Sequence, residues 1–420
     1  MTQFSCNLVS CFTGKCCESC KKSKKIESAG KMFKSQFHVG MLANTIASTQ
    51  LGSIYLALTN RSDNLVLSYQ SSTNSVLKVD RRTAIRDQIE ILSKVEGFFE
   101  SSVIFALLRL GMFEEIGLEE RSIGELSKKT GADGQKLGRL LRAAVTMGIL
   151  DSGDGKSFSL SKPAKNVMVE TITESYLADW IRFLDHLYTV FAKLDQSIWV
   201  NKGPVFDLTE ELQETPEVAN SFSRAMETYA RLRGRELADY LNLAGSKSLL
   251  DVGCGPGTYS YYLALKNPKL KLVLLDFPSV LEETEGLSRW RDIPNPIEYL
   301  PLNLIEDDIP GQYDTVLISN TLHMLGHKAS QELIKRLFPV VNNSGKLVIQ
   351  AQFLGTNGLG RRWPAILDLI MLTGSSLGEN HTVEQTLEWM SEAGFLEIEH
   401  CDLSLLNTNS VVTGRKLGGT

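Results

Sequence analysis

The fold is decided by a short glycine-rich stretch, Asp251-Val252-Gly253-Cys254-Gly255-Pro256-Gly257. This stretch follows an apolar run at 247–251 and precedes a predicted helix that begins near Thr258. Glycine adopts backbone conformations that other residues avoid, and it lets the backbone approach a ligand closely. The stretch therefore predicts a strand, a sharp turn and a helix, with a ligand bound at the turn.

On both sides of this turn the sequence alternates between short apolar runs and helical segments. The candidate strands are 247–251, 271–276, 315–318 and 346–349. Continuous apolar runs of this length are typical of strands that are buried on both faces of a parallel sheet. We therefore predict a doubly wound, Rossmann-like α/β domain over 244–420. Its last predicted elements are a helix near 383–393 and strands near 396–399 and 411–413, which could pair at the edge of the sheet.

The spacing of the glycines distinguishes between two classes of ligand. A dinucleotide-binding turn normally reads Gly-x-Gly-x-x-Gly, whereas here the third glycine comes one residue earlier and an acid, Asp251, ends the preceding strand. Asp276 ends the next strand, where a carboxylate can hydrogen-bond both hydroxyls of a ribose. We therefore predict a site for S-adenosylmethionine. The alternatives are a purely structural glycine turn and, for Asp276, a helix-capping role.

A candidate general base follows the strand at 315–318. The segment 318–327 reads Ile-Ser-Asn-Thr-Leu-His-Met-Leu-Gly-His and lies at the carboxyl edge, where open sheets bind ligands. A histidine with an ordinary pKa of about 6.5 can accept a proton from a phenol or enol as a methyl group arrives. We predict that His323 is this base. A polar loop position is the alternative for His323 and the preferred interpretation of His327.

The region before the α/β domain is predicted to be helical. From Thr83 to Phe113 apolar residues recur at helical spacing. A second helical segment that starts at Ser122 and stops before Gly131, a third helix at about 135–147 and a small hairpin that ends near 157–160 follow. Three helices and a hairpin are typical of a winged helix, whose third helix can read DNA or simply pack. Because the chain carries a net charge of −5, we expect packing. The basic residues on that helix are Lys136, Arg139 and Arg142.

Composition separates the chain into four predicted segments and limits its partners. The net charge of −5 argues against nucleic acid as a partner, no apolar run reaches the ~18 residues of a membrane span, and no secretory signal is evident, so we expect a cytoplasmic protein. Five of the seven cysteines fall in the first twenty residues; zinc binding and acylation are alternatives there to a solvated arm, and we predict no metal site.

The four predicted segments are a poorly ordered or weakly structured extension at 1–80, a winged-helix dimerisation domain at 81–165, a helical connector lining the acceptor pocket at 166–243, and the S-adenosylmethionine-binding domain at 244–420.

Taken together, these motifs resemble the plant caffeate-type and acetylserotonin-type O-methyltransferase family, from about Arg82 to the C-terminus. The resemblance rests on the winged-helix pattern, the glycine turn, Leu275-Asp-Phe-Pro278, the Leu322-His323 segment and 368–395. It implies a homodimer formed through the winged-helix domain and methyl transfer to a hydroxyl of a small aromatic or quinone-like acceptor. It implies that His323 is catalytic, that the cofactor is held by Asp251, Gly253, Gly255, Gly257, Asp276, Phe277, Asn303, Leu304 and Ser319, and that the acceptor is held by Met226, Met371 and Asn380.

Several positions depart from the family pattern. Ala351 and Asn380 stand where two acids usually orient the base, and Asn303 stands where an acid usually contacts the adenine end. Ser319 replaces a basic residue that is common in the plant members, and Met324 replaces an acid. Plant phenylpropanoids are therefore not the expected substrates. Methylation of carbon, and a non-catalytic winged-helix regulator that senses S-adenosylmethionine, are the alternatives.

Overall fold

The computed structural model describes residues 67–70, 76–170, 175–199, 208, 216–403 and 409–418. The chain divides into two compact units, Met1–Val95 and Glu96–Thr420. The predictions made for the cysteine cluster and for most of the extension at 1–80 lie outside the described residues. No helix in the described ranges is long and apolar enough to cross a membrane.

The first unit contains a two-stranded hairpin that the sequence pattern did not predict. Strand β1 (Leu67–Gln70) pairs antiparallel with β2 (Val76–Val79). Helix α3 (Arg81–Arg109) then begins at Asp80, whose carboxylate accepts hydrogen bonds from the backbone N–H groups of Arg82 (2.9 Å) and Thr83 (3.2 Å). Such a cap stabilises the first turn of a helix.

The start of the second unit contains the predicted helices and hairpin, together with two short helices that the sequence pattern did not predict. The elements after α3 are α4 (Met112–Ile116), β3 (Arg121–Ser122), α5 (Ile123–Thr130), α6 (Gly134–Thr146), β4 (Leu150–Asp151), β5 (Ser157–Leu160) and α7 (Lys162–Met168). The three strands form one small sheet in the order β3-β5-β4. Helix α6 buries Leu137 and Leu141 against Phe158, so one face of this third helix packs in the core.

Three helices connect this part to the sheet domain: α8 (Ala178–Phe191), α9 (Leu194–Ile198) and α11 (Pro216–Tyr240). The helical spacing of apolar residues predicts one helix over 174–199 and another from Pro216 to about Tyr240. The first prediction is wrong within the described residues 175–199. Lys193 adopts φ −120°, which is outside the helical range, and α9 starts a new helix after it. The predicted helix from Pro216 to about Tyr240 is confirmed by α11.

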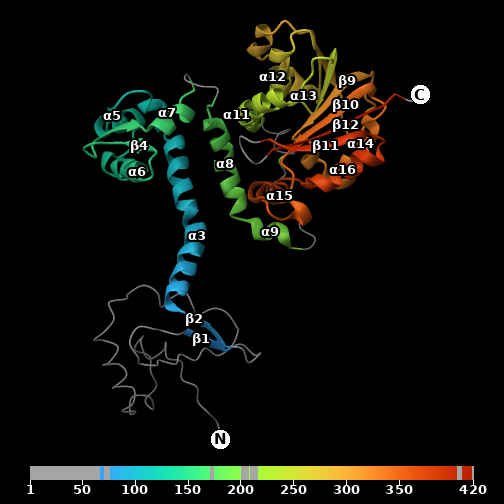
Figure 1. The fold of residues 1–420 in the computed structure, drawn as a ribbon. Helices are drawn as coiled ribbons and strands as arrows, with labels where there is room; N and C mark the ends of the chain where they lie inside the picture. Colours follow the sequence, from blue (N-terminus) through green and yellow to red (C-terminus); the bar gives the residue numbers. More distant parts are fainter. Residues whose placement is uncertain are drawn as a thin grey trace, which may run out of the picture. The chain divides into compact units, whose positions relative to one another are not determined.

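A seven-stranded sheet forms the centre of the α/β domain (Figure 1). Its strands in chain order are β6 (Ser248–Val252), β7 (Lys271–Asp276), β8 (Ile297–Pro301), β9 (Tyr313–Ser319), β10 (Val341–Ala351), β11 (Leu396–Asp402) and β12 (Ser410–Arg415). In space they follow the order β11-β12-β10-β9-β6-β7-β8, and only β12 runs antiparallel to its neighbours. The predicted doubly wound, mostly parallel sheet is therefore confirmed, as is the pairing of the last two strands at its edge.

Helices cover both faces of this sheet (Figure 1). On one face α11, α12 (Thr258–Lys266), α13 (Pro278–Glu285) and the short η2 (Ser288–Asp292) pack; on the other lie α14 (Gly326–Leu337) and α16 (Val383–Glu392). The remaining helices are η3 (Leu322–Met324), η4 (Thr356–Gly358) and α15 (Arg362–Gly374).

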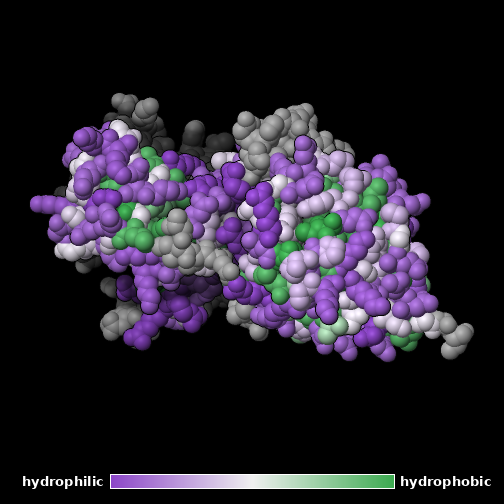
Figure 2. Space-filling model, turned by 90° about the horizontal axis from the view of Figure 1, so that it is seen from above, coloured by the Kyte–Doolittle hydropathy of each residue, from purple (hydrophilic) through white to green (hydrophobic). Residues whose placement is uncertain are grey.

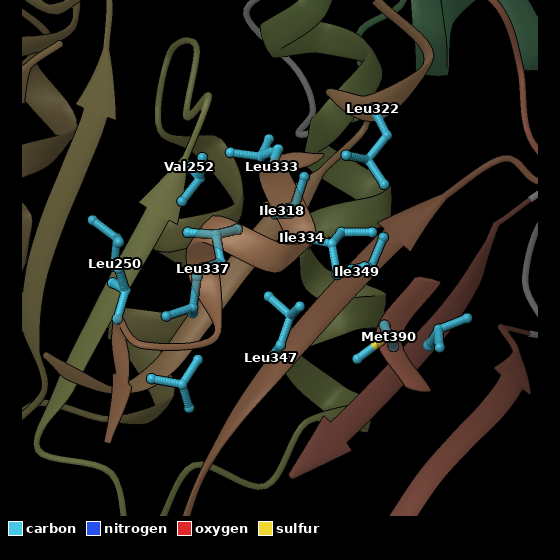
Figure 3. Packing of buried hydrophobic residues seen from close by; sticks show 14 of the residues in the cluster. Leu250, Val252, Ile318, Leu322, Leu333, Ile334, Leu337, Leu347, Ile349 and Met390 are labelled. Atoms are coloured by element: carbon cyan, nitrogen blue, oxygen red, sulfur yellow. The ribbon is translucent and has the colours of Figure 1, made fainter. Parts of the chain in front are cut away.

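The core explains why the strands read as continuous apolar runs. Figure 3 shows Leu250 and Ile318 of the sheet facing Leu333 and Leu337 of α14, all within 2% exposure. The alternate residues of the same strands, such as Leu249, pack against α11 and α12 on the other face. Every strand side chain near the middle of the sheet is therefore buried, whichever way it points.

The outer surface is more polar than this core. The face of the molecule seen in Figure 2 is mostly hydrophilic and is interrupted by patches of hydrophobic side chains. In the single chain several hydrophobic residues in the first two thirds of α3 are exposed, among them Leu92 (51%), Phe98 (43%) and Phe99 (60%). Exposed apolar residues of this number on one helix favour contact with a partner.

The strand order places a switch point between β6 and β9. From β6 the chain moves outward to β7 and β8, and then returns to place β9 on the other side of β6. Loops diverge above such a pair, and ligands of open parallel sheets bind in the resulting crevice at the carboxyl ends of the strands. Val252 and Ile318 pair at this edge, so the glycine turn and the His323 segment emerge side by side.

Candidate active site

The glycine turn adopts a conformation that requires glycine at three positions. Gly253, Gly255 and Gly257 have φ values of 71°, 52° and 66°, which are in the left-handed region. A Cβ atom on Gly253 would lie 2.6 Å from Cγ2 of Thr321, and one on Gly257 would lie 2.6 Å from the Trp290 ring. A Cβ on Gly255 would meet nothing within 4 Å. The first and third glycines thus permit close packing, while the second leaves open backbone that a ligand can approach.

Asp276 holds this turn against the next strand. One carboxylate oxygen accepts a hydrogen bond from Gly255 N (2.8 Å) and the other accepts one from Phe277 N (2.8 Å). Burial raises the pKa of Asp276, and these two N–H donors oppose that rise. Each carboxylate oxygen keeps a further lone pair, so the group can still accept hydrogen bonds from two adjacent ribose hydroxyls.

Asp251 is buried beneath the turn, one residue before the end of β6. One of its oxygens accepts a hydrogen bond from Ser260 Oγ (2.6 Å), and the other is buried with no partner among the described residues. Burial raises the pKa of this carboxyl to about 7. A buried carboxylate oxygen without a donor costs free energy unless a ligand supplies one. Asp251 and the open backbone at Gly255 fit a ligand with hydroxyl and ammonium groups, as S-adenosylmethionine has.

Replacing Asp251 with Asn should raise the melting temperature of the unliganded protein at pH 8 and leave it nearly unchanged at pH 4. The folded-state pKa of about 7 lies above the ordinary value, so the wild type loses stability as the pH rises through this window. Each 1 kcal/mol of unfolding free energy that the neutral amide restores should raise the melting temperature by roughly 2–4 °C. Thermal unfolding at both pH values measures the effect, and an equal shift at both would exclude ionisation of Asp251 as the cause.

The other predicted cofactor residues lie at the ends of β7, β8 and β9. Phe277 begins α13 with 42% of its surface exposed, and Leu304 is buried. Asn303 follows β8, and its side-chain oxygen accepts a hydrogen bond from Ile305 N (3.0 Å), so that oxygen shapes its own turn. Ser319 ends β9, and its buried hydroxyl has no partner within the described ranges.

Asn320 is a residue of this edge that the sequence analysis did not single out. It has φ 52°, and its amide donates hydrogen bonds to Tyr259 Oη (2.8 Å) and to Gln350 Oε1 (3.0 Å). These bonds join α12, the end of β9 and β10 at the carboxyl edge of the sheet, beside the switch point. Asparagine tolerates the left-handed region, and an Asn directly after a predicted strand is the signal that could have identified it.

His323 lies on the short helix η3, which follows β9. Its side chain is 8% exposed, and burial lowers its pKa to about 4. Its Nδ1 is buried without a hydrogen-bond partner, and none of the acids in the described ranges pairs with the ring. The imidazole is therefore neutral near pH 7 and can accept a proton.

A second histidine fixes the backbone that carries His323. The Nε2 atom of His381 lies 3.1 Å from Leu322 O and 3.1 Å from Ser330 Oγ, so it ties η3 to α14. Its pKa is also lowered to about 4, chiefly by burial. His327 is partly exposed and packs its ring 4.9 Å from the His381 ring. The sequence pattern does not point to His381, because nothing in its spacing connects it with Leu322.

A cluster of methionine and aromatic side chains lies beside η3. Met226 of α11, Met371 of α15 and Met324, the residue after His323, belong to this one cluster. The structure thus brings together the two methionines predicted to hold the acceptor. The buried members are Phe183, Leu187, Ala225, Leu367, Ile370 and Met371, and Trp180, Leu184, Phe191, Phe222, Met226, Met324, Trp363 and Ile366 pack against them.

Asn380 is buried beside this cluster, and its side chain is occupied by the protein itself. Its amide donates hydrogen bonds to Gln352 O (2.9 Å) and Pro364 O (3.0 Å), and its oxygen accepts one from His381 N (2.9 Å). The side chain thus ties the loop after β10 to the start of α15. The bonds position the elements on which Met371 and His381 lie.

Buried polar groups gather where the cluster meets the end of β10. Tyr229 Oη, Gln352 Oε1 and Trp363 Nε1 are all buried, and the side chains of Gln352 and Trp363 oppose the rise in the pKa of Tyr229 that burial causes, so the three groups lie close to one another. The Trp180 ring lies 4.5 Å from the Tyr229 ring and 6.3 Å from the Trp363 ring. The apolar cluster is therefore bordered by hydrogen-bonding groups at this end.

The sheet order, the glycine turn and the carboxylate after β7 together define a class I S-adenosylmethionine-dependent methyltransferase. Residues 175–396 match the O-methyltransferase domain, and residues 92–170 match the O-methyltransferase dimerisation domain. The chain therefore belongs to the O-methyltransferase family. Its S-adenosylmethionine dependence and its class of reaction, predicted from the glycine turn and the family resemblance, are confirmed by this membership.

Similar proteins match this chain over different shares of its length. The 3-hydroxy-5-methyl-1-naphthoate 3-O-methyltransferase of Streptomyces sahachiroi is 22% identical, over 76% of this chain and 93% of that protein. The L-tyrosine C(3)-methyltransferase of Streptomyces lavendulae is 25% identical, over 50% of this chain and 59% of that protein. The structure of human N-acetylserotonin methyltransferase in complex with S-adenosylmethionine shares the fold, with a TM-score of 0.71 and 16% identity over 83% of this chain and 100% of that one.

Proposed function

We infer that this enzyme transfers a methyl group from S-adenosylmethionine to a hydroxyl of a small aromatic or quinone-like acceptor. The observation that carries the proposal is the buried, neutral imidazole of His323. This residue comes two positions after Thr321, whose hydroxyl donates a hydrogen bond to Gly253 O (3.3 Å), and one position before Met324 of the methionine-aromatic cluster. The naphthoate relative named above acts on an aromatic hydroxyl, which supports the same acceptor class.

The cofactor is assigned to the carboxyl edge of the sheet. When bound there, S-adenosylmethionine supplies an electrophilic methyl group on its sulfonium. Asp276 accepts hydrogen bonds from the ribose hydroxyls, and the backbone at Gly255 provides close approach. The unpaired oxygen of Asp251 accepts from the ammonium group. The remaining proposed contacts are Gly253, Gly257, Phe277, Asn303, Leu304 and Ser319.

The acceptor is assigned to the methionine-aromatic cluster. Met226 and Met371 hold its flat ring from α11 and α15, and the polarizable thioether suits such a contact. Asn380 acts on this site by fixing the start of α15. A ring in this position has its hydroxyl near His323, which precedes Met324 of the same cluster.

His323 removes the proton from the acceptor hydroxyl as the new bond forms. In this step the oxygen bonds to the methyl carbon, the carbon–sulfur bond breaks with its electron pair passing to sulfur, and the proton passes to the imidazole. The products are a methyl ether, S-adenosylhomocysteine and a protonated His323, which releases its proton to water. Burial makes the imidazolium unfavourable, so that release is favoured.

The dimerisation region is proposed to pair two copies of the chain. The exposed Leu92, Phe98 and Phe99 of α3 fall in the matched dimerisation domain, and the helices and the small sheet of this region support the winged helix that we propose for it. We propose the predicted boundaries of 81–165, 166–243 and 244–420 for the domains after the extension. Sedimentation equilibrium should give twice the 46.6 kDa chain mass.

Product analysis tests the reaction. Hydroxylated naphthoates, benzoates and hydroxyquinones are incubated with the full-length enzyme and S-adenosylmethionine, and each product is located by mass spectrometry and NMR. We expect an O-methyl ether from at least one aromatic hydroxyl compound, and no product when that hydroxyl is replaced by hydrogen. A methyl group on ring carbon, as the name of the tyrosine relative indicates for that enzyme, would contradict the proposal.

A further inference from the structure

We propose that Arg233 binds the carboxylate of the methionine part of S-adenosylmethionine. This assignment rests on the cofactor site proposed at the glycine turn, and it adds a positively charged subsite that the sequence analysis did not predict.

Arg233 lies on α11 where this helix packs against the start of α12. A Cβ atom on the next residue, Gly234, would lie 3.5 Å from Thr258 O and 3.5 Å from Tyr259 Cα. Helix α12 begins directly after the glycine turn at Gly257. The Arg233 charge is also close enough to Tyr259 to oppose the rise in its pKa that burial causes. The guanidinium is therefore adjacent to the proposed cofactor site.

The guanidinium is fixed in place but only partly used. Its Cζ lies 3.3 Å from the centroid of the Tyr229 ring, and its Nη1 donates a hydrogen bond to Tyr229 O (2.8 Å). Its Nε is buried and has no partner. The Arg233 side chain also lies close enough to the Tyr229 phenol to oppose the rise in its pKa that burial causes. An arginine offers five N–H donors in a rigid plane, so the donors that these contacts leave can bind a further acceptor.

Arg233 also lacks an acidic partner, in contrast to its neighbours. Arg231 pairs with Glu227 (3.2 Å), and Arg289 pairs with the same carboxylate. No carboxylate in the described ranges forms an ion pair with Arg233. A partly buried cation with no acid beside it suits an anionic ligand, because the planar guanidinium can hold a carboxylate through two parallel hydrogen bonds.

The charges of the ligand and of the turn require such a group. The amino-acid end of S-adenosylmethionine carries one ammonium and one carboxylate. The acids at the turn, Asp251 and Asp276, suit the ammonium and the ribose hydroxyls but repel a carboxylate. Ser319 and Asn320 at the end of β9 are uncharged. Arg233 supplies the missing positive charge from α11.

Two ligands that differ only in the carboxylate test this assignment. Titration calorimetry measures the affinity of the full-length protein for S-adenosylhomocysteine and for its decarboxylated analogue, which keeps the amine. We expect the wild type to prefer S-adenosylhomocysteine, and Arg233→Gln to lose about 10- to 100-fold in affinity for it while binding the analogue as the wild type does. Arg233→Lys should retain part of the preference, because it keeps the charge but not the fork.

Arg224→Gln is the matched control, since it removes the same charge from an exposed position of the same helix. It should change neither affinity. An equal loss for both ligands in Arg233→Gln would show that Arg233 only supports the fold, and no loss for either would show that the carboxylate binds elsewhere; each result overturns the assignment. Asp276→Asn tests the cofactor site separately, because it should weaken both ligands alike.

Discussion

His323→Ala is expected to lower turnover by about 10²- to 10⁴-fold and to leave the affinity for S-adenosylhomocysteine within about twofold. The alanine removes the only proposed proton acceptor beside the methionine-aromatic cluster, while the glycine turn and Asp276 remain as they are. Steady-state kinetics with the best acceptor, together with titration calorimetry, measure the two quantities. His400→Ala on β11 is the control, because it removes an exposed histidine at the outer edge of the sheet.

The pH dependence gives a second measurement of the same role. Because burial lowers the pKa of His323 to about 4, its basic form persists below the usual range of histidine, and activity on an acidic phenol should stay level from pH 8 down to about pH 5. Acid affects stability differently from activity. The histidine takes up a proton more easily in the unfolded chain, so the folded protein loses stability as the pH falls below about 6.5. An acid limb centred near pH 6.5 in wild type, or turnover unchanged in His323→Ala, would contradict the base assignment.

The sequence predicted the sheet because its central strands are buried on both faces. Leu250 and Leu274 are fully buried, although they face opposite sides of the sheet, so their strands read as uninterrupted apolar runs. Strand β8 was missed because it lies at the edge and contains the exposed Glu298 and Pro301. An edge strand has only one neighbour and needs less apolar sequence, so its pattern resembles that of a loop.

The parts of the site that follow a strand directly were also predictable. Asp276 and His323 could be placed because parallel strands bring their carboxyl ends to one edge. Arg233, Asn320 and His381 could not, because their importance comes from contacts between segments that are distant in the sequence. His381 reaches Leu322 across 59 residues, and no local pattern encodes that contact.

The missing acids beside the base have a structural consequence of their own. Asn380 uses its side chain to join Gln352 and Pro364, and Ala351 ends β10 with no polar group. The His323 ring is therefore held by packing and by the backbone of η3, which His381 fixes through Leu322. A neutral base in an apolar surrounding removes a proton only from an acidic hydroxyl. This favours phenols over aliphatic alcohols as methyl acceptors.

Asp276→Ala is expected to weaken the binding of S-adenosylhomocysteine by about 100-fold or more. The change removes the acceptor for Gly255 N and Phe277 N, so the turn loses its link to β7, and the ribose loses its carboxylate. Hydrogen bonds to a charged group contribute about 1.5–3 kcal/mol each, and two such losses account for the expected factor. Titration calorimetry at pH 8 measures the affinity, with Asp292→Ala as an exposed control.

The same carboxylate predicts how the affinity depends on pH. Burial raises the pKa of Asp276, so the ionised form that accepts the ribose hydroxyls is lost at a higher pH than for an ordinary aspartate. Affinity for S-adenosylhomocysteine should therefore decline more steeply on acidification in the wild type than in Asp276→Asn, where of the two carboxyls only Asp251 still titrates. The variant starts weaker, because its amide places a donor against one of the two backbone N–H groups. If Asp276→Ala bound the ligand as tightly as the wild type, the ribose would lie elsewhere, and the glycine turn would have only a structural role.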